Sequence, residues 1–404
     1  MTNSCDALII GAGPAGSTVA TLLARAGWKV MLVERENFPR TKVCGECIAA
    51  PNLPLLDHLG LGLTFHALAG PSIKQVAVIS GQHDIRAPLP PLEHTARPWG
   101  RALRREHLDW LLLQQAEKSG AIVYQPWTMQ SFSGEAGNWL CRLRASGSTA
   151  TQEIQASLLI AAHGSWHRPH SQEHRPSDLL AFKTQFTSSR LEPGVLPVLA
   201  FPGGYGGMVV SDAGMTTVAC CIRRDRLAAC RAQAPQRPAG EAMEAYLKTS
   251  CKGVRDVLEG AERSSPWLAA GPIRPGCHLN KAPQDVFVIG NAAGEAHPII
   301  GEGISMAIQS AWLLASHLLE KEKTTLSRDE QRTVRRNYAL RWRYLFTNRL
   351  SLSAAFAHLA MHPPLTSALL PLLHYQPELL THAARWCGKV SKPPPGNRLS
   401  PASG

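Results

Sequence analysis

A glycine-rich turn near the N-terminus separates an apolar run from a helical pattern. Residues 8–16 read LIIGAGPAG, which gives Gly11, Gly13 and Gly16 the spacing G-x-G-x-x-G. In such a turn the first glycine permits a tight bend, the second lets the backbone approach a pyrophosphate, and the third lets the helix lie close to the strand. The free N–H groups of the first helical turn, which contains Ala15, would face the phosphate oxygens, where the helix dipole favours negative charge.

An acidic residue completes this pattern. Glu34 ends a second apolar run, residues 30–33, and Arg35 follows it directly. At this distance from the glycine turn, the carboxylate of Glu34 can accept hydrogen bonds from an adenosine ribose. The alternative is a glycine turn with a purely structural role. The position of the turn between strand and helix, with the acidic residue in place, favours a dinucleotide site in a Rossmann-like α/β domain.

The composition is that of a large globular protein with a basic surface. The 404 residues are 44% hydrophobic, which is ample for a buried core, and the net charge is +12 at pH 7. The basic residues are scattered along the chain, and no nucleic-acid-binding motif accompanies them. We therefore interpret them as a solvated surface and expect no nucleic-acid partner.

The cysteines and the N-terminus indicate a cytoplasmic location. Ten cysteines are spread over the chain without the rhythm of a disulfide scaffold, and the first strand pattern follows Met1 without a secretory leader. The most apolar long run, residues 299–319, contains Glu302 and other polar residues, so we expect no spanning segment. Cys44 and Cys47 form a C-x-x-C. We favour a packing or cofactor-loop role over a redox or metal role, because no second pair completes a zinc site.

Three later segments carry motifs that occur together with this glycine turn in one flavoprotein family. Residues 38–45, FPRTKVCG, contain P-R-x-K-x-C-G; residues 105–109, REHLD, have the form R-x-x-[LF]-D; and residues 290–303 contain GNAAG, a proline and GEG. With these motifs the chain resembles the flavoprotein monooxygenase superfamily of the p-hydroxybenzoate hydroxylase type. Within it, the chain is similar to the geranylgeranyl reductases and flavin-dependent halogenases.

The resemblance implies FAD as the cofactor and assigns its contacts. The glycine turn would bind the pyrophosphate, and residues 290–303 would wrap the ribityl chain. N–H groups at the start of the following helix would stabilise the reduced flavin, which is anionic at N1 and O2. Beyond the glycine turn, the residues expected to contact FAD are Glu34, Arg35, Arg40, Lys42, Cys44, Gly45, Arg105, Asn291, Gly301, Gly303 and Ile304.

Two positions depart from the family pattern. Asn291 stands where the family usually has aspartate, although its amide oxygen can still accept a hydrogen bond from a ribityl hydroxyl. His163 stands in a turn where the hydroxylases have A-D-G, a turn that contacts both FAD and the nicotinamide donor. We expect NAD(P)H as the electron donor, with a separate flavin reductase as the alternative.

The expected fold class is α/β: a discontinuous Rossmann-like FAD-binding domain, an inserted antiparallel β-sheet substrate domain and a helical C-terminal region. Four glycines within residues 203–207 indicate either a mobile loop over the flavin or a hairpin turn. The expected segments are the FAD-binding domain at 1–63, 101–177 and 276–325, the substrate domain at 64–100 and 178–275 with a helix at 240–260, the helical region at 326–391 with a stop at Pro371, and a disordered tail at 392–404.

The C-terminal region allows two interpretations. A helical lid on the FAD-binding domain is favoured. In the alternative, Arg341, Arg343 and Arg349, together with Trp342 and Trp386, contact an anionic membrane as a peripheral surface.

The expected function is FAD-dependent oxidation chemistry on a hydrophobic or aromatic small molecule of secondary or lipid metabolism. A monooxygenase that hydroxylates or epoxidises through a flavin C4a-peroxide ranks first. The alternative is a geranylgeranyl-reductase-like double-bond reductase or dehydrogenase; a halogenase ranks lower because no W-x-W-x-I-P segment is present, and an FAD-free scaffold is the non-enzymatic alternative. A carrier protein is a further candidate partner. Catalysis would centre on the flavin without a metal, and the candidate residues beside it are His297, Pro298, Gly301 and Gly303.

Overall fold

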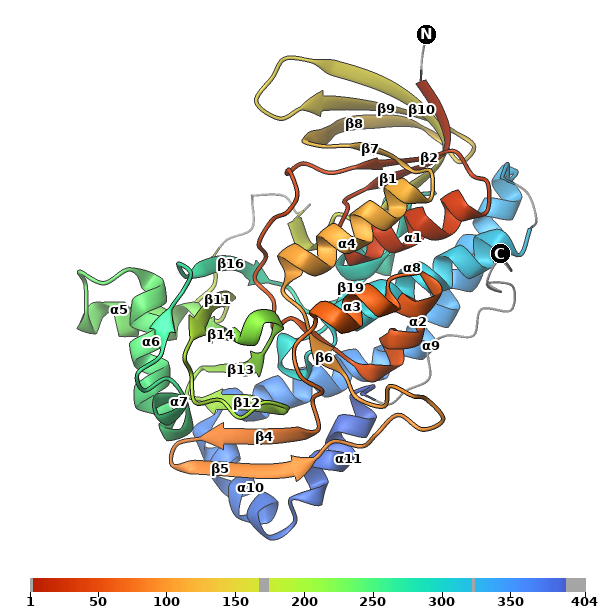
Figure 1. Cartoon of the computed structure of the whole chain (residues 1–404). Helices are drawn as coiled ribbons and strands as arrows, with labels where there is room; N and C mark the ends of the chain where they lie inside the picture. The colour runs from red at the N-terminus through yellow and green to blue at the C-terminus, as the bar shows by residue number, and fades with distance from the viewer. Residues whose placement is uncertain (1–2, 167–173, 322–323, 390–404) are drawn as a thin grey trace.

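Two large β-sheets, with helices packed against each, make up the protein (Figure 1). The computed structural model describes residues 3–166, 174–321 and 324–389. The expected disordered tail at 392–404 lies outside these residues. The α/β fold class with an inserted sheet and C-terminal helices is confirmed.

The first sheet contains the glycine turn. Its strand order is β7-β2-β1-β10-β9-β8, with β18 beside β10; β9 is antiparallel to both of its neighbours, and the other pairs are parallel. Residues 7–10 of β1 and all of β2 are buried on both faces, which explains why these residues read as apolar runs. The strands are β1 (Asn3–Ile10), β2 (Val30–Val33), β7 (Ile122–Tyr124), β8 (Trp127–Glu135), β9 (Asn138–Ala145), β10 (Thr151–Ala161) and β18 (Phe287–Val288).

Three helices lie side by side against this sheet (Figure 1). They are α1 (Pro14–Arg25), α4 (Arg105–Lys118) and α8 (Gly303–Leu319). Helix α1 begins at the glycine turn and packs between the other two. The glycine turn lies at the N-terminus of α1, the motif at 105–109 at that of α4, and the end of the motif at 290–303 at that of α8.

The second sheet has the strand order β15-β11-β14-β13-β12-β4-β5, with β16 also beside β11. All neighbouring strands are antiparallel except β12 and β4, which are parallel. Through the pairing of β4 with β12, residues 75–88 join strands that come more than 100 residues later in the sequence. The strands are β4 (Gln75–Ser80), β5 (His83–Pro88), β11 (Leu179–Thr187), β12 (Val195–Phe201), β13 (Gly204–Val210), β14 (Thr216–Arg223), β15 (Glu262–Arg263) and β16 (Leu268–Ile273).

The two faces of the second sheet differ. The outer face, which includes Phe182, Leu199 and Met208, packs against α5 (Arg224–Gln233), α6 (Ala239–Ser250) and α7 (Lys252–Val257). The expected single helix at 240–260 is thus two helices, because the chain leaves helical geometry at Cys251, which adopts extended backbone angles. The inner face contacts the loop after β2 through Lys183, and its Ala181 and Tyr205 pack against the C-terminal helices.

The expected mobile loop at the glycines of 203–207 is not observed. Gly203 has a φ of +76° and turns the chain, and Gly204 to Val210 form β13, which pairs with β12 and β14. The hairpin alternative is therefore the correct one, and the glycines let neighbouring side chains approach the strand.

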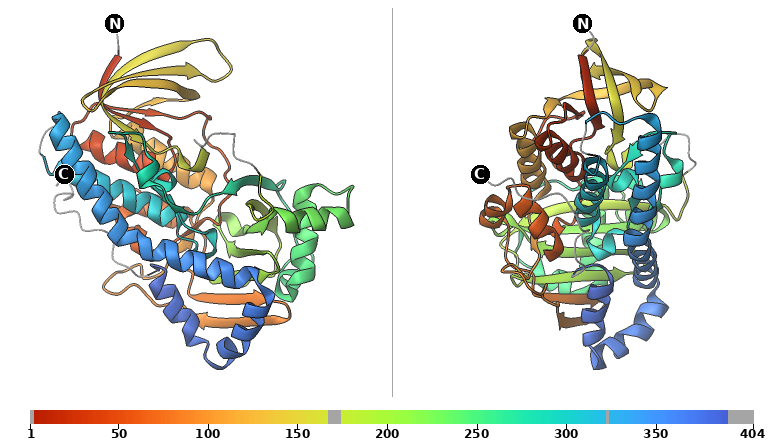
Figure 2. Two further views of the ribbon diagram at one scale, coloured as in Figure 1. Left: turned by 180° about the vertical axis from the view of Figure 1, so that it is seen from behind. Right: turned by 90° about the vertical axis from the view of Figure 1, so that its right-hand side faces the viewer.

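The long helix α9 (Arg328–Met361) spans the molecule and contacts both halves (Figure 2). Ser327 and Glu330 form a capping box at its start. Its buried stripe contains Tyr338, whose hydroxyl donates to the Val288 carbonyl at 2.9 Å, and Trp342. Helices α10 (Pro363–Tyr375) and α11 (Glu378–Trp386) follow and cover the β5 edge.

Two expectations for this C-terminal region are wrong. Pro371 lies inside α10 and does not stop it; the side chain is exposed, so water can satisfy the carbonyl that loses its partner. Trp342 and Arg349 are 1% and 6% exposed, because their side chains point from α9 into the protein interior. They are therefore not available to a membrane surface. Trp386 is exposed. In the part of the chain that is described, no helix is long and apolar enough to cross a membrane.

Short elements connect these units. They are β3 (Cys47–Ile48), η1 (Ala50–Asn52), α2 (Leu53–His58), α3 (Gly62–Leu68), β6 (Arg101–Ala102), η2 (Gly164–Trp166), η3 (Asp212–Gly214), β17 (Gly276–Cys277), η4 (Leu279–Lys281), η5 (Gly290–Ala292), β19 (Gly294–Glu295) and η6 (Pro298–Ile300).

Replacing Gly16 with alanine should destabilise the fold. The added methyl carbon would lie 1.8 Å from the Gly11 carbonyl oxygen, so α1 would have to move away from β1. We expect the free energy of unfolding, measured with denaturant, to fall by about 2–3 kcal/mol. Gly45→Ala is the control, since its methyl carbon would meet no atom within 4 Å. Equal stability of both variants would contradict the close helix–strand contact.

Candidate flavin site

The glycine turn is shaped by two close backbone contacts. Gly11 has a φ of +104°, and a Cβ there would lie 2.6 Å from the Ala162 carbonyl oxygen at the end of β10. Gly16 allows α1 to approach the same turn. Gly13 precedes α1 in extended conformation, and the first residue of the helix is proline, which leaves N–H groups of the next residues, including that of Ala15, directed into the turn.

Two arginines converge over Gly13. A Cβ at Gly13 would lie 3.9 Å from an Nη atom of Arg40 and 3.9 Å from one of Arg105. The buried carboxylate of Asp109 holds both side chains: it accepts bonds of 2.7 and 2.6 Å from Arg105 and lies 3.3 Å from Nη1 of Arg40. Nε and Nη1 of Arg40 have no hydrogen-bond acceptor among the described residues. A buried guanidinium group with nitrogen atoms that lack an acceptor, next to a helix N-terminus, fits a pyrophosphate.

Glu34 lies at the other side of this turn. Its carboxylate accepts the Ala12 N–H at 3.0 Å and the Glu36 N–H at 3.1 Å, and Nη2 of Arg40 is 3.6 Å away. These contacts fix an acidic group at the carboxyl end of β2, where the hydroxyls of a ribose would donate hydrogen bonds to it. Arg35, in contrast, is exposed and pairs with Glu36.

The loop that follows carries the other predicted residues of the P-R-x-K-x-C-G motif. Lys42 is half-buried, and this burial, together with Arg40 nearby, lowers its pKa to about 8. The Cys44 thiol accepts the Glu46 N–H at 3.4 Å. A Cβ at Gly45 would meet no atom within 4 Å, so the loop has open space beside it.

Residues 290–303, the later flavin segment, contact the start of α1. Gly290 has a φ of +59°, and a Cβ there would lie 3.0 Å from Cβ of Ala15. The Asn291 amide donates to the Ser165 hydroxyl at 3.2 Å, which leaves its carbonyl oxygen to accept from a ligand. At the start of α8, Gly303 has open space at its Cβ position, and Ile304 is buried.

Glu302 and Lys389 form an ion pair at this turn. Nζ of Lys389, near the end of the described chain, lies 2.9 Å from the buried Glu302 carboxylate and donates to the Gly301 carbonyl at 3.3 Å. The nearby anionic groups raise the pKa of Lys389 although burial opposes this. Lys389 also borders a small apolar pocket of about 20 Å³, whose walls include Cys47, Trp99 and Leu196.

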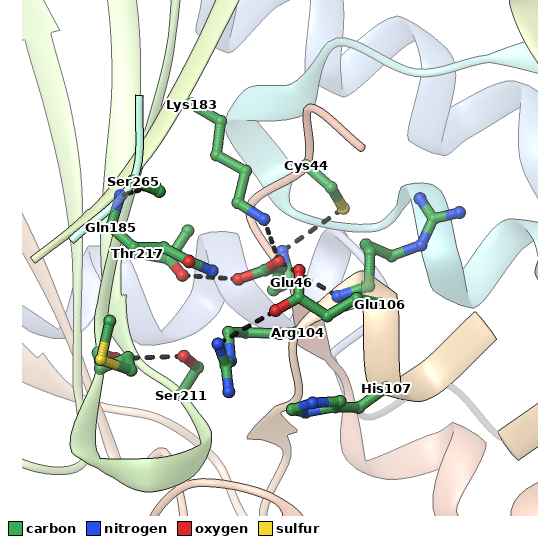
Figure 3. A network of polar contacts seen from close by, with 12 residues as sticks. Cys44, Glu46, Arg104, Glu106, His107, Lys183, Gln185, Ser211, Thr217 and Ser265 are labelled. Carbon is green, nitrogen blue, oxygen red and sulfur yellow. Dashed lines mark hydrogen bonds and ion pairs between the residues drawn. The ribbon is translucent and has the colours of Figure 1, made fainter. Parts of the chain in front are cut away.

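A buried ion pair joins the flavin loop to the second sheet (Figure 3). Glu46 is 0% and Lys183 2% exposed, and the Lys183 ammonium donates to Oε1 of Glu46. The same Oε1 accepts the Arg105 N–H at 3.1 Å, and Oε2 accepts the Thr217 hydroxyl at 2.5 Å. Lys183 and Thr217 come from β11 and β14, so Glu46 ties the inner face of this sheet to the start of α4.

A second contact between the two halves involves His297. The Tyr205 hydroxyl of β13 lies 3.0 Å from Nδ1 of His297, and the His297 N–H donates to the Ser353 hydroxyl at 3.1 Å. Burial lowers the pKa of His297 to about 4, so the imidazole is neutral at pH 7. A neutral imidazole that accepts the tyrosine proton at Nδ1 carries its own proton on Nε2, where it can donate to a ligand. Pro298, the next residue, is exposed.

Sequence reasoning missed several of these residues. Glu46, Lys183, Tyr205 and Lys389 belong to none of the recognised motifs. One signal was present: Lys183 is a single charge within the apolar run LLAF-K-TQF of a strand, which is typical of a buried, paired lysine. Among the described residues no group of acidic, histidine or cysteine side chains could hold a metal ion, and all ten cysteines are free.

Comparison with known proteins agrees with this geometry. Residues 4–332 match the family described as FAD binding domain. The chain belongs to this family. It is thus an FAD-dependent oxidoreductase of the monooxygenase superfamily, and the resemblance found in its motifs is confirmed.

Individual relatives differ in their reactions. The flavoprotein is 27% identical to the tryptophan 2-halogenase of Chondromyces crocatus, over 78% of this chain and 61% of the halogenase. It is 24% identical to the menaquinone reductase of Mycobacterium tuberculosis, over 80% of this chain and 79% of the reductase. It is also 24% identical to squalene epoxidase 4 of Arabidopsis thaliana, over 78% of this chain and 62% of the epoxidase. The chain therefore spans about three fifths of the halogenase and the epoxidase.

A solved structure shows the same fold. The myxobacterial chondrochloren halogenase CndH superimposes with a TM-score of 0.74 over 94% of this chain and 93% of that chain, at 19% sequence identity.

Removing the Arg40 guanidinium should weaken FAD binding. Arg40→Met keeps the apolar stem but removes the cation that faces the pyrophosphate position. Because a charge-assisted hydrogen bond contributes about 1.5–3 kcal/mol, we expect the Kd for FAD, measured by calorimetry with the FAD-free flavoprotein, to rise about tenfold to a hundredfold. Arg142→Met, on the exposed side of β9, is the matched control. An unchanged Kd in Arg40→Met would place the pyrophosphate elsewhere.

His297 should make stability depend on pH. Below pH 6.5 the unfolded chain binds a proton at this histidine, whereas the folded chain does so only near pH 4. Stability therefore falls as pH decreases through this window, by at most about 3 kcal/mol from this group. His297→Gln should show a smaller loss between pH 6.5 and 4 in denaturant unfolding, and His83→Gln on the surface is the control for removing a histidine. Identical pH dependence of wild type and His297→Gln would contradict a buried neutral imidazole.

Proposed function

We propose that this flavoprotein is a monooxygenase that hydroxylates or epoxidises a hydrophobic or aromatic small molecule. The observation that carries the proposal is the inner face of the second sheet, which contacts the flavin loop through the Lys183–Glu46 pair and carries small apolar residues beside that pair. An apolar surface beside the flavin favours oxygen chemistry, because exclusion of water prevents side reactions. The similarity to a squalene epoxidase supports the choice.

The protein's own residues would bind FAD, orient the reacting groups and exclude water from them. FAD, when bound, supplies electron transfer and activation of oxygen. Arg40 and Arg105, fixed by Asp109, would hold the pyrophosphate, and Glu34 the ribose. The N–H groups at the start of α8 would place positive dipole beside the flavin ring. Nε2–H of His297 is available to donate a hydrogen bond without a change of charge at neutral pH.

A double-bond reductase or dehydrogenase is the second candidate. The Cys44 thiol supports it: this side chain is half-buried in the flavin loop, next to Arg105, where it can serve as a proton donor. The similarity to a menaquinone reductase also favours this candidate. The electron donor in either case is proposed to be NAD(P)H, delivered directly or through a separate flavin reductase, and we place the enzyme in the cytoplasm.

The reaction of the reduced flavin distinguishes the two candidates. FAD-loaded protein is reduced with dithionite, freed of excess reductant and mixed either with air-saturated buffer or anaerobically with a polyprenyl alkene. For a monooxygenase we expect the flavin absorbance to return quickly with O₂ and not with the alkene. Fast return with the alkene and slow return with O₂ would overturn the proposal in favour of a reductase. Arg40→Met, with little FAD bound, is the control for oxidation by free flavin.

A further inference from the structure

The inner face of the second sheet has a row of small residues at its centre. Strand register places Lys183 beside Ala219, Ala219 beside Gly207, and Gly207 beside Val198. Ala219, Gly207 and Val198 are only partly buried, and a Cβ at Gly207 would meet just one atom within 4 Å, the Pro197 carbonyl oxygen at 3.1 Å. The row is therefore apolar and partly exposed, has no bulky side chain at Gly207 or Ala219, and ends at the buried Lys183–Glu46 pair.

One polar group at this end lacks a partner. Gln185 lies two residues after Lys183 on β11, so both side chains project from the same face, and Gln185 pairs with Thr217 across the strands. Figure 3 shows Lys183, Gln185 and Thr217 around Glu46. Gln185 is 6% exposed, yet its Nε2 has no hydrogen-bond partner among the described residues. An unpaired buried N–H is costly, which indicates that a ligand supplies the acceptor.

The neighbouring charges define what that acceptor can be. Nε2 of Gln185 is a donor, so the ligand must present an acceptor oxygen. Glu46 and Lys183 compensate each other, so the site has no excess positive charge to stabilise a buried carboxylate, and the Glu46 carboxylate would repel one. A neutral carbonyl oxygen satisfies the amide without introducing a charge.

We propose that the inner face of the second sheet binds a flat, apolar molecule with a neutral carbonyl-type oxygen, which accepts a hydrogen bond from Nε2 of Gln185 while the apolar body lies over Ala219 and Gly207. This inference rests on the proposed function, because it defines the substrate class of the same sheet face. Gln185 is then a specificity-determining residue.

The test uses three ligands of similar size that differ in their oxygen. They are 1-tetralone with a carbonyl, tetralin without one, and 1-naphthoate with a carboxylate. Dissociation constants are measured by calorimetry with the FAD-loaded, oxidised protein, so that no turnover is needed. We expect 1-tetralone to bind more tightly than either of the others.

Substitution of Gln185 provides the second arm. Gln185→Leu should raise the Kd for 1-tetralone about fivefold to tenfold and leave that for tetralin unchanged, since only one neutral hydrogen bond is lost. Gln185→Met keeps an unbranched side chain and should behave in the same way if leucine impairs folding. Gln155→Leu, exposed on β10, is the matched control and should bind all three ligands as the wild type does.

Three results would overturn the inference: equal Kd values for 1-tetralone and tetralin in the wild type, tightest binding of 1-naphthoate, or an unchanged 1-tetralone Kd in the Gln185 variants. The proposed function fails by a different result, namely slow reaction of the reduced flavin with O₂. A protein that discriminates the ligands through Gln185 but reacts slowly with O₂ keeps the substrate class and loses the monooxygenase assignment.

Discussion

The buried pair of Glu46 and Lys183 joins the two halves of this flavoprotein. Glu46 belongs to the loop after β2, and Lys183 to the second sheet, and both are removed from water. Removing one member of such a pair leaves an uncompensated charge and costs about 3–5 kcal/mol. Because Glu46 also accepts the Arg105 N–H, the position of the sheet and the position of the α4 N-terminus are coupled. The position of the second sheet over the flavin loop depends on this contact.

The other charged side chains of the site also lie next to groups of opposite charge. Asp109 lies between Arg40 and Arg105, Glu34 is a second anion beside Arg40, and Lys389 pairs with Glu302 beside the start of α8. Each of these contacts places an anion beside a buried cation near a flavin segment. The apolar surfaces between the pairs can then remain dry, as chemistry on a bound flavin requires.

Much of the nucleotide-binding half could be predicted from the sequence, because its determinants are local. The glycine spacing at residues 11–16, the apolar runs around it and the motif at 105–109 each specify geometry within a few residues. The second sheet was less predictable. The start of β13 shows why, because Gly204 to Gly207 carry no strand signal and are held by pairing on both sides. For the same reason Tyr205, within that stretch, was not connected with His297.

The sequence by itself determined the fold class, the family and the cofactor, since the residues that bind a dinucleotide must occur at fixed spacing along a strand, a turn and a helix. Only the tertiary structure decided which side chains meet between the two halves of the molecule. Glu46 and Lys183 are 137 residues apart, and Tyr205 and His297 are 92 apart. No periodicity relates such positions; strand register and the packing of the two halves of the molecule bring them together, and burial keeps His297 neutral at pH 7.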